Sequence, residues 1–324
     1  MSDVNFENWV AIVTGAGNGL GKAYALELGK RGAKVVVNDL GGAVDGSGSG
    51  SSPADDVVDE IIKNGGEAVA NYDSVASKDG GESIVQTAVD NFGTVDAVIN
   101  NAGILRDRSF ANMTEEEFLL IIDVHLKGTF YVTHPAFKIM KENNYGRIVN
   151  VASPSGLFGN FGQANYGAAK MGIVGLTNVL AIEGAKYNIK VNVIAPTAYT
   201  RMTEGLIPED VGKFMTPELV TPLVTYLASE ACEPTHEIYG VAAGRFARIG
   251  IITHEGYVNQ QATAEDIANN IDEIRTITDG TYPLSNDDEN MLIMKALQGN
   301  SSNEWSVYNL IWQKLKQNQL MQKS

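Results

Sequence analysis

The chain has 324 residues, of which 44% are hydrophobic, and carries a formal net charge of −15 at pH 7. That length and hydrophobic content are enough for one large α/β domain or two small ones. The acidic balance, without a basic run or a basic amphipathic stretch, excludes nucleic acid and an anionic membrane surface as expected partners.

Cellular location is suggested by what the sequence lacks. The single cysteine, Cys232, allows no disulfide framework within the chain, so a reducing compartment is the simplest assumption. The N-terminal MSDVNFENWV is not a signal peptide, and no segment approaches the ~20 apolar residues that cross a bilayer. The final MQKS is not a Ser-Lys-Leu peroxisomal signal. We therefore expect a cytosolic protein; a peroxisomal location is expected only for a unit of a larger enzyme. No metal site is predicted.

Short apolar, β-branched runs recur along the chain, with helical patterns between them. They lie at 9–14, 34–39, 67–72, 95–100, 147–153, 190–195 and 237–243. Apolar strands that alternate with amphipathic helices are typical of an α/β fold, a parallel sheet covered on both faces. Thr114, with Glu117 three residues later, forms a capping box that predicts a helix start.

Two segments interrupt this rhythm. The Gly/Ser-rich stretch 41–53 predicts a mobile surface loop inside the second β–α connection, without a domain boundary. Beyond about residue 250 the chain is polar, with one helix expected after Thr263 and Asp266 and another at 303–317. We therefore expect a domain over 1–250 and, over 251–324, a helical extension packed on that domain.

The first strand runs into the glycine-rich stretch TGAGNGLG. Gly15, Gly19 and Gly21 fall where a strand turns into a helix, so backbone amides and the helix N-terminus can face a pyrophosphate. A plain tight turn is an alternative, because the spacing differs from G-x-G-x-x-G. Asp39 closes the second strand, where a carboxylate can bind an adenosine ribose and repels the 2′-phosphate of NADP. The sequence thus favours NAD over NADP; a solvated strand-end acid is the alternative for Asp39.

Tyr166 and Lys170 stand one helical turn apart in NYGAAK. A free phenol has a pKa of about 10, too high for a base at neutral pH, and a nearby ammonium favours the phenolate. An aromatic–lysine pair on a helix surface is the alternative. Ser153 ends the strand thirteen residues before the tyrosine and could stabilise a substrate oxygen; Ser155 is its rival, but the spacing favours Ser153.

The combination of TGAGNGLG, NNAG at 100–103 and a serine followed by Tyr-x-x-x-Lys resembles the short-chain dehydrogenase/reductases, from about residue 5 to about 245. The resemblance implies a Rossmann-like doubly wound parallel sheet of about seven strands and a nicotinamide cofactor. It makes Tyr166 the general acid/base, Lys170 the residue that holds the nicotinamide ribose and lowers the tyrosine pKa, and Ser153 the residue that binds substrate. The cofactor-binding residues it implies are Gly15, Asn18, Gly19, Leu20, Gly21, Asp39, Asp73, Ser74, Val75, Asn101, Tyr166, Lys170, Ala198 and Tyr199.

His125 departs from the usual family pattern, in which an asparagine at this place helps hold a water of a proton relay. A packed or exposed helix histidine is the alternative to a relay role. With VNDLGG, NYDSV and DVHLKGTF, the sequence resembles the (3R)-hydroxyacyl-CoA dehydrogenase units of type 2 peroxisomal multifunctional enzymes, in which a histidine is ordinary.

The sequence therefore predicts an NAD-dependent enzyme that oxidises (3R)-3-hydroxyacyl-CoA to 3-ketoacyl-CoA, as in fatty acid β-oxidation. A hydroxysteroid dehydrogenase or 3-oxoacyl reductase with the same triad, and a catalytically silent NAD-binding scaffold, are the alternatives. A homodimer or larger homo-oligomer is expected. To offset the net charge we expect a basic patch for the CoA phosphates, from Arg106, Arg108, Lys127, Arg201 and Arg245.

Overall fold

The computed structural model describes residues 4–205 and 207–298. Its contacts divide the chain into a first unit, Met1–Ile249, and a second unit that begins at Gly250. All the strands of the sheet lie in the first unit. That the second unit packs on the same domain stays a prediction.

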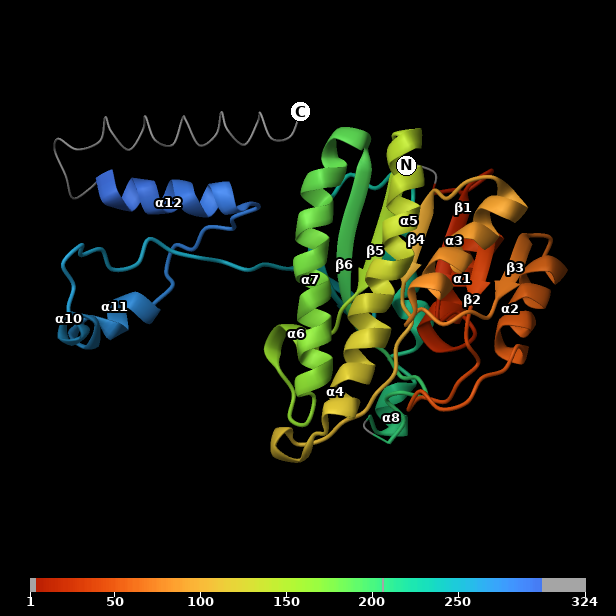
Figure 1. Ribbon diagram of the computed structural model, residues 1–324, viewed down its shortest axis with the longest axis horizontal. Coiled ribbons are helices and arrows are strands. Elements are labelled where there is room, and N and C mark those ends of the chain that lie inside the picture. The colour runs from red at the N-terminus through yellow and green to blue at the C-terminus, as the bar shows by residue number, and fades with distance from the viewer. Residues whose placement is uncertain (1–3, 206, 299–324) are drawn as a thin grey trace. The chain divides into compact units, whose positions relative to one another are not determined.

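The first unit is built on one eight-stranded sheet (Figure 1). Its strands follow the order β3-β2-β1-β4-β5-β6-β7-β8, and all neighbours pair in parallel except β7 and β8. The strand bounds are β1 (Val10–Thr14), β2 (Lys34–Asn38), β3 (Glu67–Asn71), β4 (Ala97–Asn100), β5 (Gly146–Val151), β6 (Ile189–Thr197), β7 (Ile238–Ala242) and β8 (Arg245–Ile249). The seven predicted strands and the doubly wound, Rossmann-like α/β fold are thus confirmed, and β8 is an additional strand. The order reverses between β1 and β4, which opens a crevice at the carboxyl edge of the sheet.

A two-residue turn joins β7 to β8. Ala242 pairs with Arg245, and both intervening residues have positive φ angles, 50° at Ala243 and 75° at Gly244. Two positive φ values in a two-residue loop are typical of a type I′ hairpin. The sequence did not indicate this turn, because alanine stands where asparagine is usual.

Helices flank the sheet and supply the residues of the site. In the first unit they are α1 (Gly19–Lys30), α2 (Ser52–Lys63), α3 (Lys78–Phe92), α4 (Glu115–Ile121), α5 (Gly128–Asn143), α6 (Pro154–Phe158), α7 (Ala164–Gly184), α8 (Glu209–Gly212) and α9 (Thr221–Ala228), with short 3-10 segments at Phe110–Asn112, Ala185–Tyr187 and Pro217–Leu219. A π-helical segment, η2 (Ile122–Lys127), continues α4 into α5. The predicted capping box of Thr114 and Glu117 opens α4.

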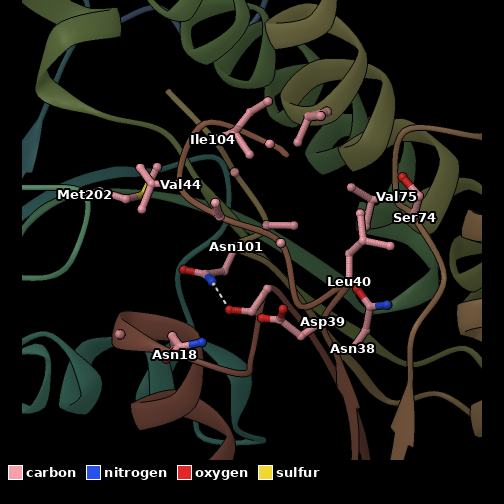
Figure 2. A pocket seen from close by; sticks show the side chains of 18 of the residues that line it. Asn18, Asn38, Asp39, Leu40, Val44, Ser74, Val75, Asn101, Ile104 and Met202 are labelled. Carbon is pink, nitrogen blue, oxygen red and sulfur yellow. Dashed lines mark hydrogen bonds between the residues drawn. The ribbon is translucent and has the colours of Figure 1, made fainter. Parts of the chain in front are cut away.

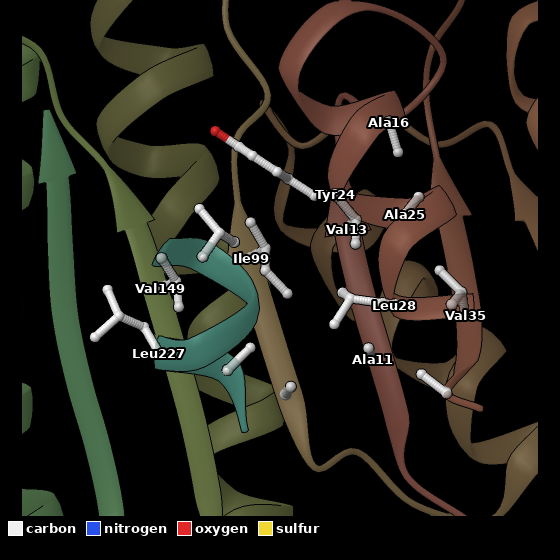
Figure 3. Packing of buried hydrophobic residues seen from close by; sticks show 14 of the residues in the cluster. Ala11, Val13, Ala16, Tyr24, Ala25, Leu28, Val35, Ile99, Val149 and Leu227 are labelled. Atoms are coloured by element: carbon white, nitrogen blue, oxygen red, sulfur yellow. The ribbon is translucent and has the colours of Figure 1, made fainter. Parts of the chain in front are cut away.

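The sheet has a hydrophobic core on each face. Ala11 and Val13 of β1 face α1, α2 and α9 on one side (Figure 3), and the alternate residues Val10 and Ile12 face α3, α5 and α7 on the other. Both faces of the strand are therefore buried, which explains its unbroken apolar sequence. The two helical layers leave only the strand ends open, and the site lies there.

The second unit contains three described helices, α10 (Ala264–Asn269), α11 (Ile271–Arg275) and α12 (Asn286–Gln298). Thr263 and Asp266 form the predicted capping box at the start of α10. The helix expected at 303–317 lies outside the described residues. Over residues 4–205 and 207–298, none of the helices has the length and apolar character that a bilayer crossing needs.

Candidate active site

A cavity of about 280 Å³ lies at the carboxyl ends of β1, β2 and β4 (Figure 2). This is the edge at which the strand order reverses, where doubly wound folds bind ligands. Nine of the fourteen predicted cofactor residues line it: Gly15, Asn18, Gly19, Leu20, Asp39, Asp73, Ser74, Val75 and Asn101. Ile104 and the 40–46 part of the Gly/Ser-rich segment complete one wall.

The glycine-rich turn packs tightly against the end of β4. A Cβ on Gly15, which has a φ of 63°, would lie 2.7 Å from the Cα of Ala102, and one on Gly21 would lie 2.2 Å from the Gly15 carbonyl oxygen. Asn101 Nδ2 donates to the carbonyl oxygens of Thr14 and Gly15 at 3.1 and 3.0 Å. Gly21 therefore serves this close packing and does not line the cavity.

Helix α1 presents an open N-terminus beside the cavity. Its N-cap residue, Asn18, makes no side-chain capping hydrogen bond, and no acidic residue lies in the first turn. The first N–H groups of a helix have no partner within it and attract an anion. A dinucleotide pyrophosphate fits this arrangement, since the glycines keep Cβ atoms out of the turn.

Asp39 joins two backbone segments at the cavity wall. Its Oδ2 accepts from the Gly17 N–H at 2.8 Å, and its Oδ1 accepts from the Gly41 N–H at 2.7 Å. Gly17, which we did not single out in the sequence, is required here because a Cβ would lie 2.9 Å from the carboxylate carbon. The carboxylate thus helps to shape the cavity as well as carrying charge.

Buried asparagines hold the next part of the wall. Asp73 Oδ2 accepts from Asn71 Nδ2 at 3.0 Å and from Ser83 Oγ at 2.7 Å. Asn38 lines the cavity and donates from Nδ2 to the Asp73 carbonyl oxygen at 2.9 Å. The sequence signal for Asn38 was its polar side chain at the end of an otherwise apolar strand.

The loop after β6 contributes other residues than those expected. Ala198 is buried, and Tyr199 packs against Gly212, where a Cβ would lie 2.5 Å from the tyrosine ring; neither lines the cavity. Thr200, Arg201 and Met202 line it instead. Tyr166 and Lys170 also lie off the cavity wall.

The structure brings together the three residues predicted to act in catalysis. Ser153 is the N-cap of α6, directly after β5, and its Oγ accepts from the Ser155 N–H at 3.2 Å. Tyr166 lies in the first turn of α7 and is hydrogen bonded to Ser153. Lys170, on the same helix face, places its Nζ 5.5 Å from the centre of the tyrosine ring.

Burial raises the pKa of Tyr166 to about 12. The hydrogen bond with Ser153 lowers this pKa, and the charge of Asp107 raises it. The net direction is opposite to that expected from the sequence. The reason is that a buried phenolate loses the hydration that stabilises it in water.

Lys170 is itself buried, with 3% of its surface exposed, and its Nζ donates to the Val151 carbonyl oxygen at 2.6 Å. Burial lowers its pKa to about 7. The amine therefore gains and loses a proton near neutral pH, and its carbonyl partner lies at the carboxyl end of the central strand β5.

His125 lies in the π-helical segment and is 2% exposed. Its Nε2 is 2.8 Å from the Ile104 carbonyl oxygen, and its ring meets the Tyr166 ring edge-on, with centroids 5.1 Å apart. Its Nδ1 has no hydrogen-bond partner in the described structure. Burial, and then the charge of Lys170, hold the pKa of His125 well below its usual value, so the imidazole is neutral at pH 7.

Two further residues at Tyr166 were missed in the sequence. Asn165 is fully buried: its Nδ2 donates to the carbonyl oxygens of Arg106 and Glu117, and its Oδ1 accepts from the Tyr166 N–H at 2.7 Å. Asp107 accepts from Gln163 Nε2 at 2.7 Å. The signal for Asn165 was its place in the polar run directly before the tyrosine. Asp107 lies far from the tyrosine in the sequence and comes near it only through the fold.

A family model described as short chain dehydrogenase matches residues 9–210. The chain belongs to the short-chain dehydrogenase family. Short-chain dehydrogenases use a nicotinamide cofactor, and the open helix N-terminus and glycine turn described above are suited to one.

Among short-chain dehydrogenase relatives, the chain is 51% identical to the peroxisomal hydratase-dehydrogenase-epimerase of Saccharomyces cerevisiae, over 91% of this chain and 33% of that protein. The full-length peroxisomal multifunctional enzyme type 2 of Drosophila melanogaster has a solved structure that superimposes with a TM-score of 0.77 at 39% identity, covering 91% of this chain and 50% of that one. A 7α-hydroxysteroid dehydrogenase solved with NADH and 7-oxo-glycochenodeoxycholic acid has a TM-score of 0.68 at 26% identity, covering 75% and 98%. The chain thus spans about a third to a half of the multifunctional relatives and nearly all of the steroid enzyme.

Proposed function

We propose that this chain is an NAD-dependent dehydrogenase that oxidises (3R)-3-hydroxyacyl-CoA to 3-ketoacyl-CoA. The observation that carries the proposal is the meeting of Ser153, Tyr166 and Lys170 after β5, beside the dinucleotide-type cavity. The substrate class rests on the resemblance of the sequence to multifunctional β-oxidation enzymes, which the yeast and Drosophila relatives support.

In the proposed reaction the Tyr166 oxygen accepts the proton of the C3 hydroxyl while C3 loses a hydride, so the alcohol becomes a ketone. The nicotinamide, when bound, supplies the hydride acceptor. Ser153 donates a hydrogen bond to the substrate oxygen and so keeps it within reach of the phenol. Before substrate binds, the hydrogen bond with Ser153 lowers the pKa of Tyr166. The single hydroxyl proton of Ser153 would then turn to the substrate oxygen as its hydrogen-bond partner.

We propose that Lys170 and His125 influence the uptake and onward transfer of the proton that Tyr166 accepts. Burial lowers the pKa of the lysine amine to about 7, and the charged form of the amine favours the phenolate. His125 stays neutral and keeps an unpartnered Nδ1 beside this pair, which suits it to hold a water or to pass a proton on.

We propose NAD as the cofactor. The Asp39 carboxylate on the cavity wall supports this choice, since it would repel a 2′-phosphate. Arg201 is the one basic residue in the described lining, and it lies on the loop after β6 and not beside Asp39. The relative solved with NADH also supports NAD.

The basic patch proposed for the CoA phosphates needs revision. Arg108 is paired with Glu117 at 2.8 Å, and Lys127 with Asp123 at 2.7 Å, so each of these charges is offset by a neighbouring acid. Arg106 forms no ion pair in the described structure, but its Nε already donates to the Asp45 carbonyl oxygen at 2.7 Å. That leaves Arg201 and Arg245, which have no acidic partner among the described ion pairs. We therefore propose these two residues, rather than all five, as sources of attraction for phosphate.

A steroid alcohol is the second candidate substrate, because the 7α-hydroxysteroid dehydrogenase has a similar fold. The deciding experiment measures NADH formation from both stereoisomers of 3-hydroxyacyl-CoA at several chain lengths, alongside a steroid panel and NADP. We expect turnover with the (3R) isomers and NAD. Turnover with a steroid alone would replace the proposed substrate, and NADH binding without any turnover would identify a silent scaffold.

The proposed assembly is a homodimer or larger homo-oligomer of the chain. On α7, Met171, Val179 and Ile182 are 40%, 53% and 51% exposed, an apolar face that a second copy would cover. Light scattering on the purified protein measures this directly. The proposed location is the cytosol for the chain by itself, and fractionation of cells that express it tests this against the peroxisomal location named for the yeast relative.

A further inference from the structure

The segment Leu40–Gly50, here named the strap, is held in place by contacts at its base and its tip. At the base, the Gly50 N–H donates to the Leu40 carbonyl oxygen at 2.9 Å. Within it, the Ala43 N–H donates to the Ser47 carbonyl oxygen at 2.8 Å. The strap is therefore a closed loop with its own internal turn. Its mobility, expected from the Gly/Ser composition, stays a prediction.

The strap forms part of the cavity wall. Leu40, Gly42, Ala43, Val44 and Gly46 all line the cavity, and Figure 2 shows Val44 on the same side of it as Ile104 and Met202. A ligand in this cavity would thus contact the strap directly. How well the strap is held in this conformation should therefore affect the affinity for that ligand.

The tip of the strap is fastened to the segment that follows β4. The Leu105 N–H donates to the Val44 carbonyl oxygen at 3.0 Å, and Arg106 Nε donates to the Asp45 carbonyl oxygen at 2.7 Å. Gly46 lies close to the Ile104 side chain, where a Cβ would come within 2.9 Å of Cδ1. Of these two hydrogen bonds, the one from Arg106 is donated by a side chain, and the one from Leu105 by the backbone.

The same residue is bonded to the catalytic helix on its other side. The Arg106 carbonyl oxygen accepts from Asn165 Nδ2 at 3.0 Å, and Asn165 Oδ1 accepts from the Tyr166 N–H at 2.7 Å. A continuous series of hydrogen bonds therefore runs from the strap, through Arg106 and Asn165, to the backbone of Tyr166. Asn165 is fully buried, which fixes this part of the series in one geometry.

We propose that Arg106 is a positioning residue that fastens the strap over the cofactor cavity and couples that closure to the placement of Tyr166. The inference rests on the proposed use of a nicotinamide dinucleotide in this cavity. Closing the strap orders Arg106, and an ordered Arg106 keeps Asn165 and the Tyr166 backbone in the reactive arrangement. Binding of the cofactor and readiness of the base are then linked, although Tyr166 lies off the cavity wall.

The test uses two substitutions of similar size. Arg106→Gln keeps an N–H donor at the place of Nε but loses the charge, whereas Arg106→Met loses both. Arg31→Ala is the matched control, because Arg31 also donates to a distant carbonyl oxygen, that of Val4 at 2.8 Å, outside the site. The strap itself can be removed: Gly41 and Gly50 lie side by side at its closed base, so residues 42–49 can be excised.

We expect Arg106→Met to weaken NADH binding about three- to tenfold, as measured by nicotinamide fluorescence, and to lower kcat. For Arg106→Gln and for Arg31→Ala, both the NADH dissociation constant and kcat should stay within about twofold of the parent values. NAD should protect the strap from limited proteolysis in the parent and in Arg106→Gln, but not in Arg106→Met. In the excised protein, adding Arg106→Met should change the NADH dissociation constant no further.

Equal losses in Arg106→Met and Arg106→Gln would overturn the inference, because the charge would then matter and not the bond. An undiminished effect of Arg106→Met in the excised protein would also overturn it. The proposed substrate can be refuted independently of this inference. If the parent protein binds NADH but oxidises no hydroxyacyl-CoA, the substrate assignment is wrong, and the comparison of NADH binding and proteolysis among the variants still tests the role of Arg106. A parent that binds no NADH overturns both.

Discussion

The ring of His125 stands edge-on to the ring of Tyr166, with their planes at 87°. His125 also packs against Gly103, where a Cβ would lie only 2.4 Å from the imidazole Cε1. The glycine of NNAG thus makes room for the histidine, which in turn contacts the ring of Tyr166.

Gly103→Ala should therefore lower kcat sharply. The added methyl must displace the imidazole, which contacts the Tyr166 ring, and a displacement of about 1 Å at a reacting group can cost about a hundredfold in rate. Gly175→Ala is the control, since a Cβ there meets no atom within 4 Å in the chain and alanine favours the helix. Because Gly175 lies between Met171 and Val179 on the proposed oligomer face, light scattering must show that this variant keeps the assembly of the parent. Normal turnover in Gly103→Ala would show that the placement of His125 does not matter for the reaction.

Ser153→Ala and Asp107→Asn should move the pKa of Tyr166 in opposite directions. Removing the hydrogen bond of Ser153 raises this pKa further, whereas removing the negative charge of Asp107 lowers it. The measurement is a difference titration by ultraviolet absorbance, with Tyr166→Phe as the blank. The limb on which kcat/KM for oxidation rises with pH, where the base loses its proton, should shift the same way.

The losses in kcat test the roles of Ser153 as substrate-binding residue and of Tyr166 as base. Ser153→Ala should lower kcat by about a hundred- to a thousandfold, as for removal of one oxyanion donor, and Tyr166→Phe by at least as much. Asp79→Asn, an exposed acid on α3, is the control for Asp107→Asn. A Tyr166→Phe enzyme with near-normal turnover would refute the assignment of the base.

Lys170→Met should remove a pH dependence of stability. The folded pKa of Lys170, about 7, is below its unfolded value of about 10.4, so the buried charge costs the most below pH 7. That cost is relieved as the pH rises from 7 toward 10, because the unfolded chain then binds more protons than the folded one. The free energy of unfolding should therefore rise between pH 7 and 9 by up to about 1.4 kcal/mol per unit.

Urea titrations at several pH values test this expectation. Lys170→Met should be inactive, yet more stable than the parent at pH 6, and its stability should depend less on pH. Lys63→Met, at the exposed end of α2, should keep the pH dependence of the parent. A parent protein whose stability is flat from pH 7 to 9 would contradict a buried lysine with a lowered pKa.

Asp39→Asn should narrow the preference for NAD over NADP by at least about tenfold, because a like-charge contact that costs several kcal/mol is removed. It should also destabilise the fold by about 1 kcal/mol, since the N–H groups of Gly17 and Gly41 then share a single oxygen acceptor. Ratios of kcat/KM and thermal melting measure the two effects. Asp56→Asn, an exposed residue of α2, is the control.

Ala243→Asn should stabilise the protein by roughly 0.5–1 kcal/mol. Alanine has a φ of 50° here, a left-handed conformation that asparagine adopts more readily. Asparagine followed by Gly244 is also the usual sequence of this turn. Thermal melting is the measurement, and a loss of stability would mean that the turn does not tolerate the larger side chain.

The sequence predicted those features that are set by local pattern. All seven apolar runs became strands, and both capping boxes opened helices, because periodicity and end signals act over a few residues. Strand β8 was missed, since Ala243 and Gly244 lack the asparagine that marks such turns and since Arg245 and Arg248 give the strand no apolar run.

The parts of the site that escaped prediction depend on the folded interior. The pKa of Tyr166 was expected to fall because a lysine is one turn away, but burial, which no spacing reveals, raises it. Arg106 and Asn165 are fifty-nine residues apart and become partners only through the fold. Likewise, the Gly/Ser-rich strap gave no sign that it lines the cavity.

Strand β8 runs antiparallel to β7 and so determines where the chain leaves the sheet. The seven parallel strands all end at the edge that carries the cavity, whereas β8 runs back and releases the chain at Ile249 on the opposite edge. A protein joined after Ile249 is therefore attached one strand length away from the chemistry.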